Sequence, residues 1–191
     1  MIPPLRFAYV EKDLFRGAYP IESNYAFMRT LHLKTIVSMI PAETERDLPA
    51  FCEKEHINLV KFAVPKASSK IFLSHSTIQS VLKVVCDPSN LPCYIHCLDG
   101  RYNTGIVIMC LRKLEMWQQK NYLAEYEMFT GPSELGEGDF VANFSWSYVF
   151  NQSIPRWLNH LKGKDPHPTM DVWVIEDGDN ESEKEYEYEY D

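Results

Sequence analysis

Short apolar strand patterns alternate along this chain with segments of helical spacing, and this alternation constrains the fold more than any other feature. Buried strands that alternate with helices form mainly parallel sheets covered on both faces. The sequence therefore predicts an α/β fold with a mainly parallel central sheet flanked by helices. The predicted strands are "LRFAYV" (5–10), "LFRGAYP" (14–20), "KTIVSMI" (34–40), "NLVKFAV" (58–64) and "CYIHC" (93–97).

The predicted helices lie between and after these strands. Ser23 is a candidate N-cap for a helix over 24–33, and Thr44 with Asp47 resembles a capping box. The stretch "PKASSKIF" is predicted to be a loop. The remaining predicted helices are "SHSTIQSVLKVVC" (74–86), "TGIVIMCLRKLEMW" (104–117) and "KNYLAEYEMF" (120–129).

The negative charge of the chain is concentrated at its C-terminal end. The formal net charge is -8, and the stretch from Glu176 to Asp191 contains nine acidic residues and one lysine. The rest of the chain is therefore neutral. We expect one folded domain over 1–165 that ends in a helical C-terminal extension, with the aromatic segment 140–161 packed on it. A disordered acidic tail is expected over 166–191, because so much like charge cannot be buried.

Composition argues against several other classes of protein. No apolar run approaches the roughly 18 residues of a membrane helix, and the chain starts without the apolar block of a signal peptide. Five cysteines without framework spacing fit a reducing cytosol or nucleus, and we expect a cytoplasmic protein. We also expect it to bind neither nucleic acid nor a membrane. Cys93 and Cys97 would lie about 13 Å apart in an extended strand, beyond the roughly 7 Å limit for a disulfide. The histidines form no metal-binding pattern, and we expect neither a metal nor a cofactor.

The loop "IHCLDGRYNTG" (95–105) is the candidate functional site. A strand, a tight glycine-containing loop and a helix N-terminus together bring free backbone N–H groups to one anion site. The same field favours a thiolate at its centre, which makes Cys97 a candidate nucleophile. His96 is expected to position the loop. The candidate phosphate-binding residues are Leu98, Asp99, Gly100, Arg101, Tyr102, Asn103 and Thr104.

This loop is similar to the signature of cysteine-dependent tyrosine and dual-specificity phosphatases, in which His-Cys is followed by five residues, an arginine, Ser or Thr, and Gly. From about Arg6 to about Phe129 the chain resembles the plant and fungal atypical dual-specificity phosphatases. This group includes the fungal oxidant-induced cell-cycle-arrest proteins. The resemblance also rests on "LFRGAYP", "NYAFMRTLHLKTIVSMIP" and "CLRKLEMW". It implies the αβα phosphatase fold, a phosphatase-like domain over 1–165, and activity on inositol pyrophosphates or phosphotyrosine.

The first departure from the family pattern is Asn103, which occupies the position of the signature arginine. In the family that arginine donates two charged hydrogen bonds to the phosphoryl group, and asparagine is shorter and neutral. Arg101 is a candidate replacement. However, it matches a basic residue of the family loop whose side chain is expected to point outward.

The second departure concerns the catalytic acid that relatives carry on a loop before the cysteine. Between Glu55 and Asp87 this sequence has no carboxylate. Asp99 is a candidate acid, but it could equally repel phosphate and oppose ionisation of the thiol. Three lysines could instead line an anion pocket, although solvated lysines are the simpler interpretation. They are Lys61, Lys66 and Lys70.

Three functions are consistent with these features. The first is a pseudophosphatase that acts through protein partners, such as related phosphatase-like proteins, or through weak binding of a phosphate-containing ligand. The second is an active phosphatase in which Arg101 and Asp99 fill the vacant roles. The third, ranked last, is a thiol redox sensor that uses Cys97.

Overall fold

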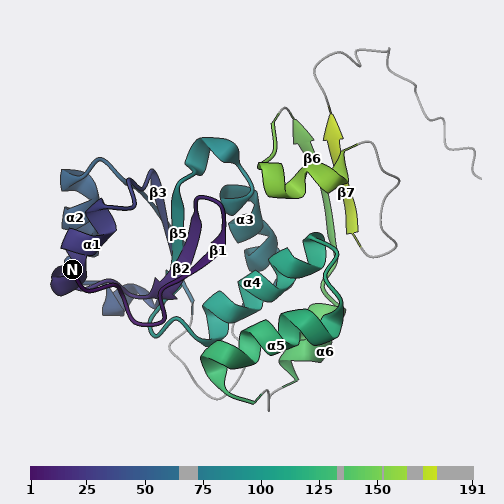
Figure 1. Cartoon of the computed structure of the whole chain (residues 1–191), viewed down its shortest axis with the longest axis horizontal. Coiled ribbons are helices and arrows are strands. Elements are labelled where there is room, and N and C mark those ends of the chain that lie inside the picture. The colour runs from purple at the N-terminus through teal and green to yellow at the C-terminus, as the bar shows by residue number, and fades with distance from the viewer. Residues whose placement is uncertain (65–72, 133–135, 152, 163–169, 176–191) are drawn as a thin grey trace, which may run out of the picture.

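A five-stranded sheet forms the centre of the protein (Figure 1). The computed structural model describes residues 1–64, 73–132, 136–151, 153–162 and 170–175. The strand order is β1-β2-β5-β3-β4; β1 is antiparallel to β2, and the other neighbouring pairs are parallel. This arrangement confirms the predicted mainly parallel sheet. The strands are β1 (Ala8–Glu11), β2 (Leu14–Ala18), β3 (Thr35–Ser38), β4 (Asn58–Lys61) and β5 (Cys93–Cys97).

Helices cover both faces of this sheet (Figure 1). One face packs against α1 (Tyr25–Arg29) and α2 (Leu48–Lys54), and the opposite face packs against the later helices. Successive side chains of β5 point to opposite faces of the sheet, so the core has two parts. Tyr94 packs on the side of α1 and α2, whereas Cys93 and Ile95 pack on the side of the later helices. The later helices are α3 (His75–Val85), α4 (Tyr102–Leu114), α5 (Gln119–Thr130) and α6 (Glu137–Ala142). The 3-10 helices are η1 (Glu22–Asn24), η2 (Ala42–Thr44), η3 (Pro88–Asn90) and η4 (Arg156–Leu161).

The prediction that Ser23 caps the first helix is wrong. Ser23 lies inside η1, and α1 begins after Asn24 and ends at Arg29. The reason is local, because the Asn24 Oδ1 atom accepts a hydrogen bond from the Ile21 backbone N–H (2.9 Å). This bond stabilises a separate 3-10 turn ahead of the helix.

The predicted capping box of Thr44 and Asp47 is also wrong. The Thr44 hydroxyl donates to the Pro41 carbonyl (2.6 Å) and therefore belongs to the preceding turn. Asp47 is the N-cap residue of α2, but its side chain makes no capping hydrogen bond. Pro49 lies in the first turn of α2, where a missing backbone N–H is tolerated. By contrast, Ser74 caps α3 by accepting a hydrogen bond from the Thr77 N–H.

The C-terminal part of the chain differs from the expected helical extension. After α6, the strand β6 (Trp146–Asn151) pairs in parallel with β7 (Met170–Ile175). β7 lies within the range 166–191 that was expected to be disordered, whereas 176–191 lies outside the described residues. Both strands are rich in β-branched and aromatic residues, which favour sheets. Trp146 and Leu158 are part of the core, which confirms that the aromatic segment packs on the domain.

All five cysteines are free, so Cys93 and Cys97 form no disulfide, as predicted. Among the described residues, no helix combines the length and the apolar character needed to cross a bilayer. The predicted loop "PKASSKIF" coincides with 65–72, outside the described residues.

Candidate active site

The candidate phosphate loop joins the end of β5 to the start of α4 and packs against the end of β2. Gly100 has a φ of 75°, in the left-handed region that favours glycine. A Cβ atom at this position would lie 2.7 Å from the Gly17 carbonyl carbon and 2.7 Å from the Ala18 nitrogen. The Tyr19 backbone N–H also donates to the Leu98 carbonyl (3.2 Å). The loop can therefore approach β2 this closely only with glycine at position 100.

Two arginines from the N-terminal part of the chain bind carbonyl groups of this loop. The Arg6 Nη1 atom donates to the Asp99 carbonyl, and the Arg16 Nη2 atom donates to the Gly100 carbonyl, both at 2.9 Å. In a planar trans peptide the carbonyl and the following N–H point in opposite directions. These contacts therefore orient the N–H groups of Gly100 and Arg101 away from the two guanidinium groups.

Arg16, like Arg6, binds the candidate loop and was not singled out from the sequence. It is buried on β2, and its guanidinium carbon lies 3.8 Å from the centre of the Phe129 ring. Burial lowers the pKa of Arg16 to about 10, while the nearby Glu125 and Cys97 act in the opposite direction. The guanidinium is thus charged at neutral pH. A charged residue within the strand pattern "LFRGAYP" was the signal available in the sequence.

The carboxylate of Asp99 lies inside the loop, next to the thiol. The Cys97 sulfur donates to Asp99 Oδ1 at 3.6 Å, and the Arg101 backbone N–H donates to the same oxygen at 3.0 Å. One of the N–H groups that could bind a phosphate oxygen therefore already holds a carboxylate oxygen. The Arg101 Nε atom lies 4.0 Å from the other carboxylate oxygen. The structure thus brings Cys97, Asp99 and Arg101 together.

His96 lies behind the cysteine. Its Nδ1 atom lies 3.2 Å from the Cys97 carbonyl oxygen, so Nδ1 carries the proton and donates a hydrogen bond to this carbonyl. Burial lowers the pKa of His96 to about 4, which keeps the ring neutral at physiological pH. The Thr104 hydroxyl at the start of α4 is also buried, and it has no hydrogen-bond partner among the described residues.

Asn103 lies in the first turn of α4, at the position that follows Arg101 and Tyr102 in the loop sequence. Its side chain makes no hydrogen bond to any residue that the structure describes. Arg101 interacts with the Asp99 carboxylate, as its weak 4.0 Å contact shows. The site therefore contains the predicted cysteine, glycine and threonine. The Arg101 guanidinium lies beside the Asp99 carboxylate, and Asn103 has no guanidinium group.

Of the three lysines predicted as candidates to line an anion pocket, Lys61 lies within the described residues. Its Nζ atom forms an ion pair with Glu45 Oε2 at 2.7 Å, on the surface near η2. Lys66 and Lys70 lie outside the described residues. In the part of the chain that the structure describes, no group of three or more His, Cys, Asp or Glu residues could hold a metal ion.

The chain is similar in sequence to known phosphatases. The model of the tyrosine phosphatase family matches residues 1–161. A Dictyostelium discoideum protein named "Probable tyrosine-protein phosphatase" is 33% identical over 159 residues, which cover 82% of this chain and 96% of that protein. The inositol diphosphatase DSP2 of Oryza sativa subsp. japonica is 35% identical over 130 residues, covering 68% of this chain and 64% of that protein.

A solved structure extends the comparison to the fold. The core catalytic domain of the PP-IP phosphatase SIW14 from S. cerevisiae, in complex with citrate, matches with a TM-score of 0.69 and 28% sequence identity. The match covers 75% of this chain and 88% of that domain. The fold described above is therefore the αβα phosphatase fold.

Proposed function

Because this chain belongs to the tyrosine phosphatase family, we propose that it is a pseudophosphatase that binds protein partners or phosphate-containing ligands without hydrolysing them. The observation that carries this proposal is the position of the Asp99 carboxylate. It accepts the Arg101 N–H inside a loop that has Asn103 in place of the signature arginine. Two independent features of one loop thus oppose phosphoryl transfer.

The first feature is the missing guanidinium. An arginine at position 103 would donate two charged hydrogen bonds to the phosphoryl oxygens, each worth roughly 1.5–3 kcal/mol. Arginine contacts at phosphoryl transition states contribute on the order of 10³–10⁵ in rate. The Asn103 amide is neutral and short, and it cannot supply this stabilisation.

The second feature is the internal carboxylate. A phosphate that accepted a hydrogen bond from the Arg101 N–H would have to displace Asp99 Oδ1 from it. The phosphate would then lie close to the negative charge of the Asp99 carboxylate. Two like unit charges about 4 Å apart repel by about 4 kcal/mol near a protein surface. Arg6, Arg16 and the backbone N–H groups still favour an anion in the loop, so weak binding is retained while turnover is lost.

The alternative function is an active phosphatase for inositol pyrophosphates or phosphotyrosine. It is favoured by the 35% identical relative named an inositol diphosphatase and by the presence of Cys97 at the start of the loop. In this alternative, Asp99 protonates the leaving group and Arg101 turns toward the phosphoryl oxygens.

The two functions are separated by measuring binding and turnover on the same protein. Inorganic phosphate is titrated while the amide NMR signals of Gly100 and Arg101 are followed. Phosphate release is assayed with an aryl phosphate and with an inositol pyrophosphate, and Cys97→Ser is the control. We expect saturable shifts of both amides at millimolar phosphate, with release equal to that of Cys97→Ser. Release that disappears in Cys97→Ser would establish the active phosphatase instead.

A further inference from the structure

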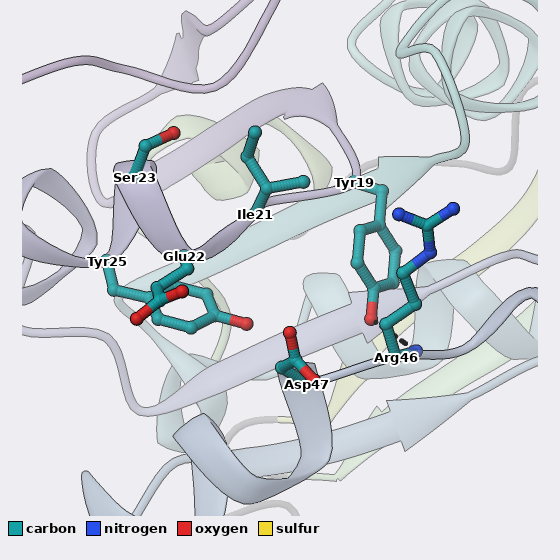
Figure 2. Close-up of a pocket in the computed structure, with 7 residues that line it drawn as sticks. All are labelled: Tyr19, Ile21, Glu22, Ser23, Tyr25, Arg46 and Asp47. Carbon is teal, nitrogen blue, oxygen red and sulfur yellow. Dashed lines mark hydrogen bonds between the residues drawn. The ribbon is translucent and has the colours of Figure 1, made fainter.

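A pocket of about 300 Å³ lies next to the candidate active site, between the end of β2, η1 and the start of α2 (Figure 2). Tyr19 belongs to both regions. Its backbone N–H donates to the Leu98 carbonyl of the loop, and its side chain lines the pocket. Its hydroxyl accepts hydrogen bonds from the backbone N–H groups of Arg46 (2.9 Å) and Leu48 (3.4 Å). These bonds fix the wall that the pocket shares with α2.

Tyr25 contributes an unpaired hydroxyl to this pocket. Only 9% of Tyr25 is exposed, and its hydroxyl has no hydrogen-bond partner among the described residues. Its ring stacks on Phe51 with centroids 4.0 Å apart, so the side chain is held in place with the hydroxyl directed into the pocket (Figure 2). Burial raises the pKa of Tyr25 to about 12, which keeps the hydroxyl protonated. A buried hydroxyl without a partner is unfavourable, and a bound ligand would satisfy it.

One end of the pocket is negatively charged. The carboxylates of Glu22 and Asp47 lie near the Tyr25 hydroxyl (Figure 2), and both negative charges contribute to the raised pKa of Tyr25. Within the described part of the chain, neither carboxylate forms an ion pair with an arginine or lysine. The Arg46 guanidinium lies at the other end of the pocket, beside the Tyr19 ring (Figure 2). The space between Glu22, Asp47 and Tyr25 therefore favours a cation.

We propose that this pocket binds the guanidinium group of an arginine side chain from a partner protein. A guanidinium presents N–H donors in a planar fork, so it can bind the carboxylates of Glu22 and Asp47 together. Its flat face also stacks on aromatic rings such as that of Tyr25. A volume of about 300 Å³ is at the small end for ligand pockets and suits a single side chain. The inference does not rest on the proposed function, because it uses none of the side chains of the loop 97–104.

The first test is an NMR titration of the full chain with a blocked pentapeptide that has arginine between glycines. The control peptide has citrulline at the same place, which preserves the shape of arginine and removes its charge. We expect saturable shifts of the Glu22, Tyr25 and Asp47 amides with the arginine peptide, and at least about tenfold weaker binding of the citrulline peptide. Equal binding of the two peptides, or shifts confined to other surfaces, would overturn the proposal.

Substitutions of the two carboxylates test whether they bind the arginine peptide. Combined Glu22→Gln and Asp47→Asn should weaken binding of the arginine peptide by about tenfold or more. Glu43→Gln is the matched control, because Glu43 is exposed on the neighbouring η2 and does not line the pocket. Unchanged binding in the double variant would contradict the proposal.

Tyr25→Phe should change stability and peptide binding in different directions. It removes the unpaired hydroxyl and keeps the stack on Phe51, so we expect a melting temperature equal to or above that of the wild type. We also expect several-fold weaker binding of the arginine peptide. If the peptide binds Tyr25→Phe as tightly as the wild type, the hydroxyl is not a ligand-binding group and the proposed site is wrong.

Discussion

Asp99 Oδ1 lies 3.6 Å from the Cys97 sulfur and accepts a hydrogen bond from the Arg101 N–H of the same loop. In a catalytic loop of this type, an incoming phosphoryl group would need the space near the sulfur and the same N–H group. The chain therefore carries a negative charge where a phosphoryl group bound in the loop would carry one. This relationship, together with Asn103, is the basis of the proposed loss of turnover.

Replacing Asp99 by Asn should strengthen anion binding. The amide keeps the shape of the carboxylate and can still accept the Arg101 N–H, but the like charge is removed. We expect inorganic phosphate to bind about tenfold more tightly, which corresponds to about 1.4 kcal/mol, as measured by calorimetric or NMR titration. Glu53→Gln is the control, because it removes one exposed negative charge on α2. Equal phosphate affinities for Asp99→Asn and Glu53→Gln would show that Asp99 does not compete with the ligand.

Replacing Asn103 by Arg should restore part of the missing chemistry. The new guanidinium can donate two charged hydrogen bonds to a phosphoryl group held by the loop. We expect hydrolysis of an aryl phosphate to rise by about tenfold or more, within the range of up to 10³–10⁵ that arginine contacts supply. Asn103→Gln tests side-chain length without charge, and Cys97→Ser in the Asn103→Arg background must abolish the gain. A folded but inactive Asn103→Arg protein would mean that the absent guanidinium is not the main defect.

The close packing of the loop on β2 is tested at Gly100. Alanine at this position would have an unfavourable positive φ and a Cβ atom 2.7 Å from the β2 backbone. A backbone strand of the central sheet cannot easily move to relieve this clash. We expect Gly100→Ala to lower the free energy of unfolding by at least about 3 kcal/mol. Gly136 has a similar φ of 77° and open space around it, so Gly136→Ala should cost only about 1 kcal/mol. Urea unfolding measures both, and equal losses would contradict the contact with β2.

The pH dependence of stability should contain a contribution from His96. Its pKa falls from 6.5 to about 4 on folding because of burial. The unfolded chain therefore binds the proton more readily between these values, and stability is lost as pH falls from 6.5 toward 4. The full contribution is about 3 kcal/mol. His96→Asn keeps a donor near the Cys97 carbonyl and should lack this component.

The measurement is the difference in the free energy of unfolding between pH 7 and pH 4.5 for the two proteins. Carboxylates titrate in both proteins over this pH range. Only the additional loss of unfolding free energy in the wild type therefore reports on His96. An equal loss in wild type and His96→Asn would show that the ring is not held neutral by burial.

The strand, loop and helix of the candidate site could be predicted because their signals are local. The apolar run of β5, the glycine at 100 and the helical spacing of α4 are adjacent in the sequence. The roles of Arg6 and Arg16 could not be predicted in this way, because these residues precede the carbonyls that they bind by 93 and 84 positions. Pairing at that separation depends on the sheet order.

The orientation of Asp99 was left open by the sequence for a related reason. A carboxylate at this position could point to solvent, to a leaving group or to the loop N–H groups, and the sequence does not distinguish these. The strands β6 and β7 were missed because each depends on the other for its hydrogen bonds, and together they form a separate two-stranded sheet.

The most direct test of the central claim is a single-turnover experiment with the protein in excess over an inositol pyrophosphate. Rapid-quench samples are analysed for released phosphate and for a phosphorylated Cys97 peptide by mass spectrometry. The account predicts no phosphocysteine and a release curve that matches that of Cys97→Ser. A phosphorylated Cys97, with release of phosphate that Cys97→Ser lacks, would contradict it.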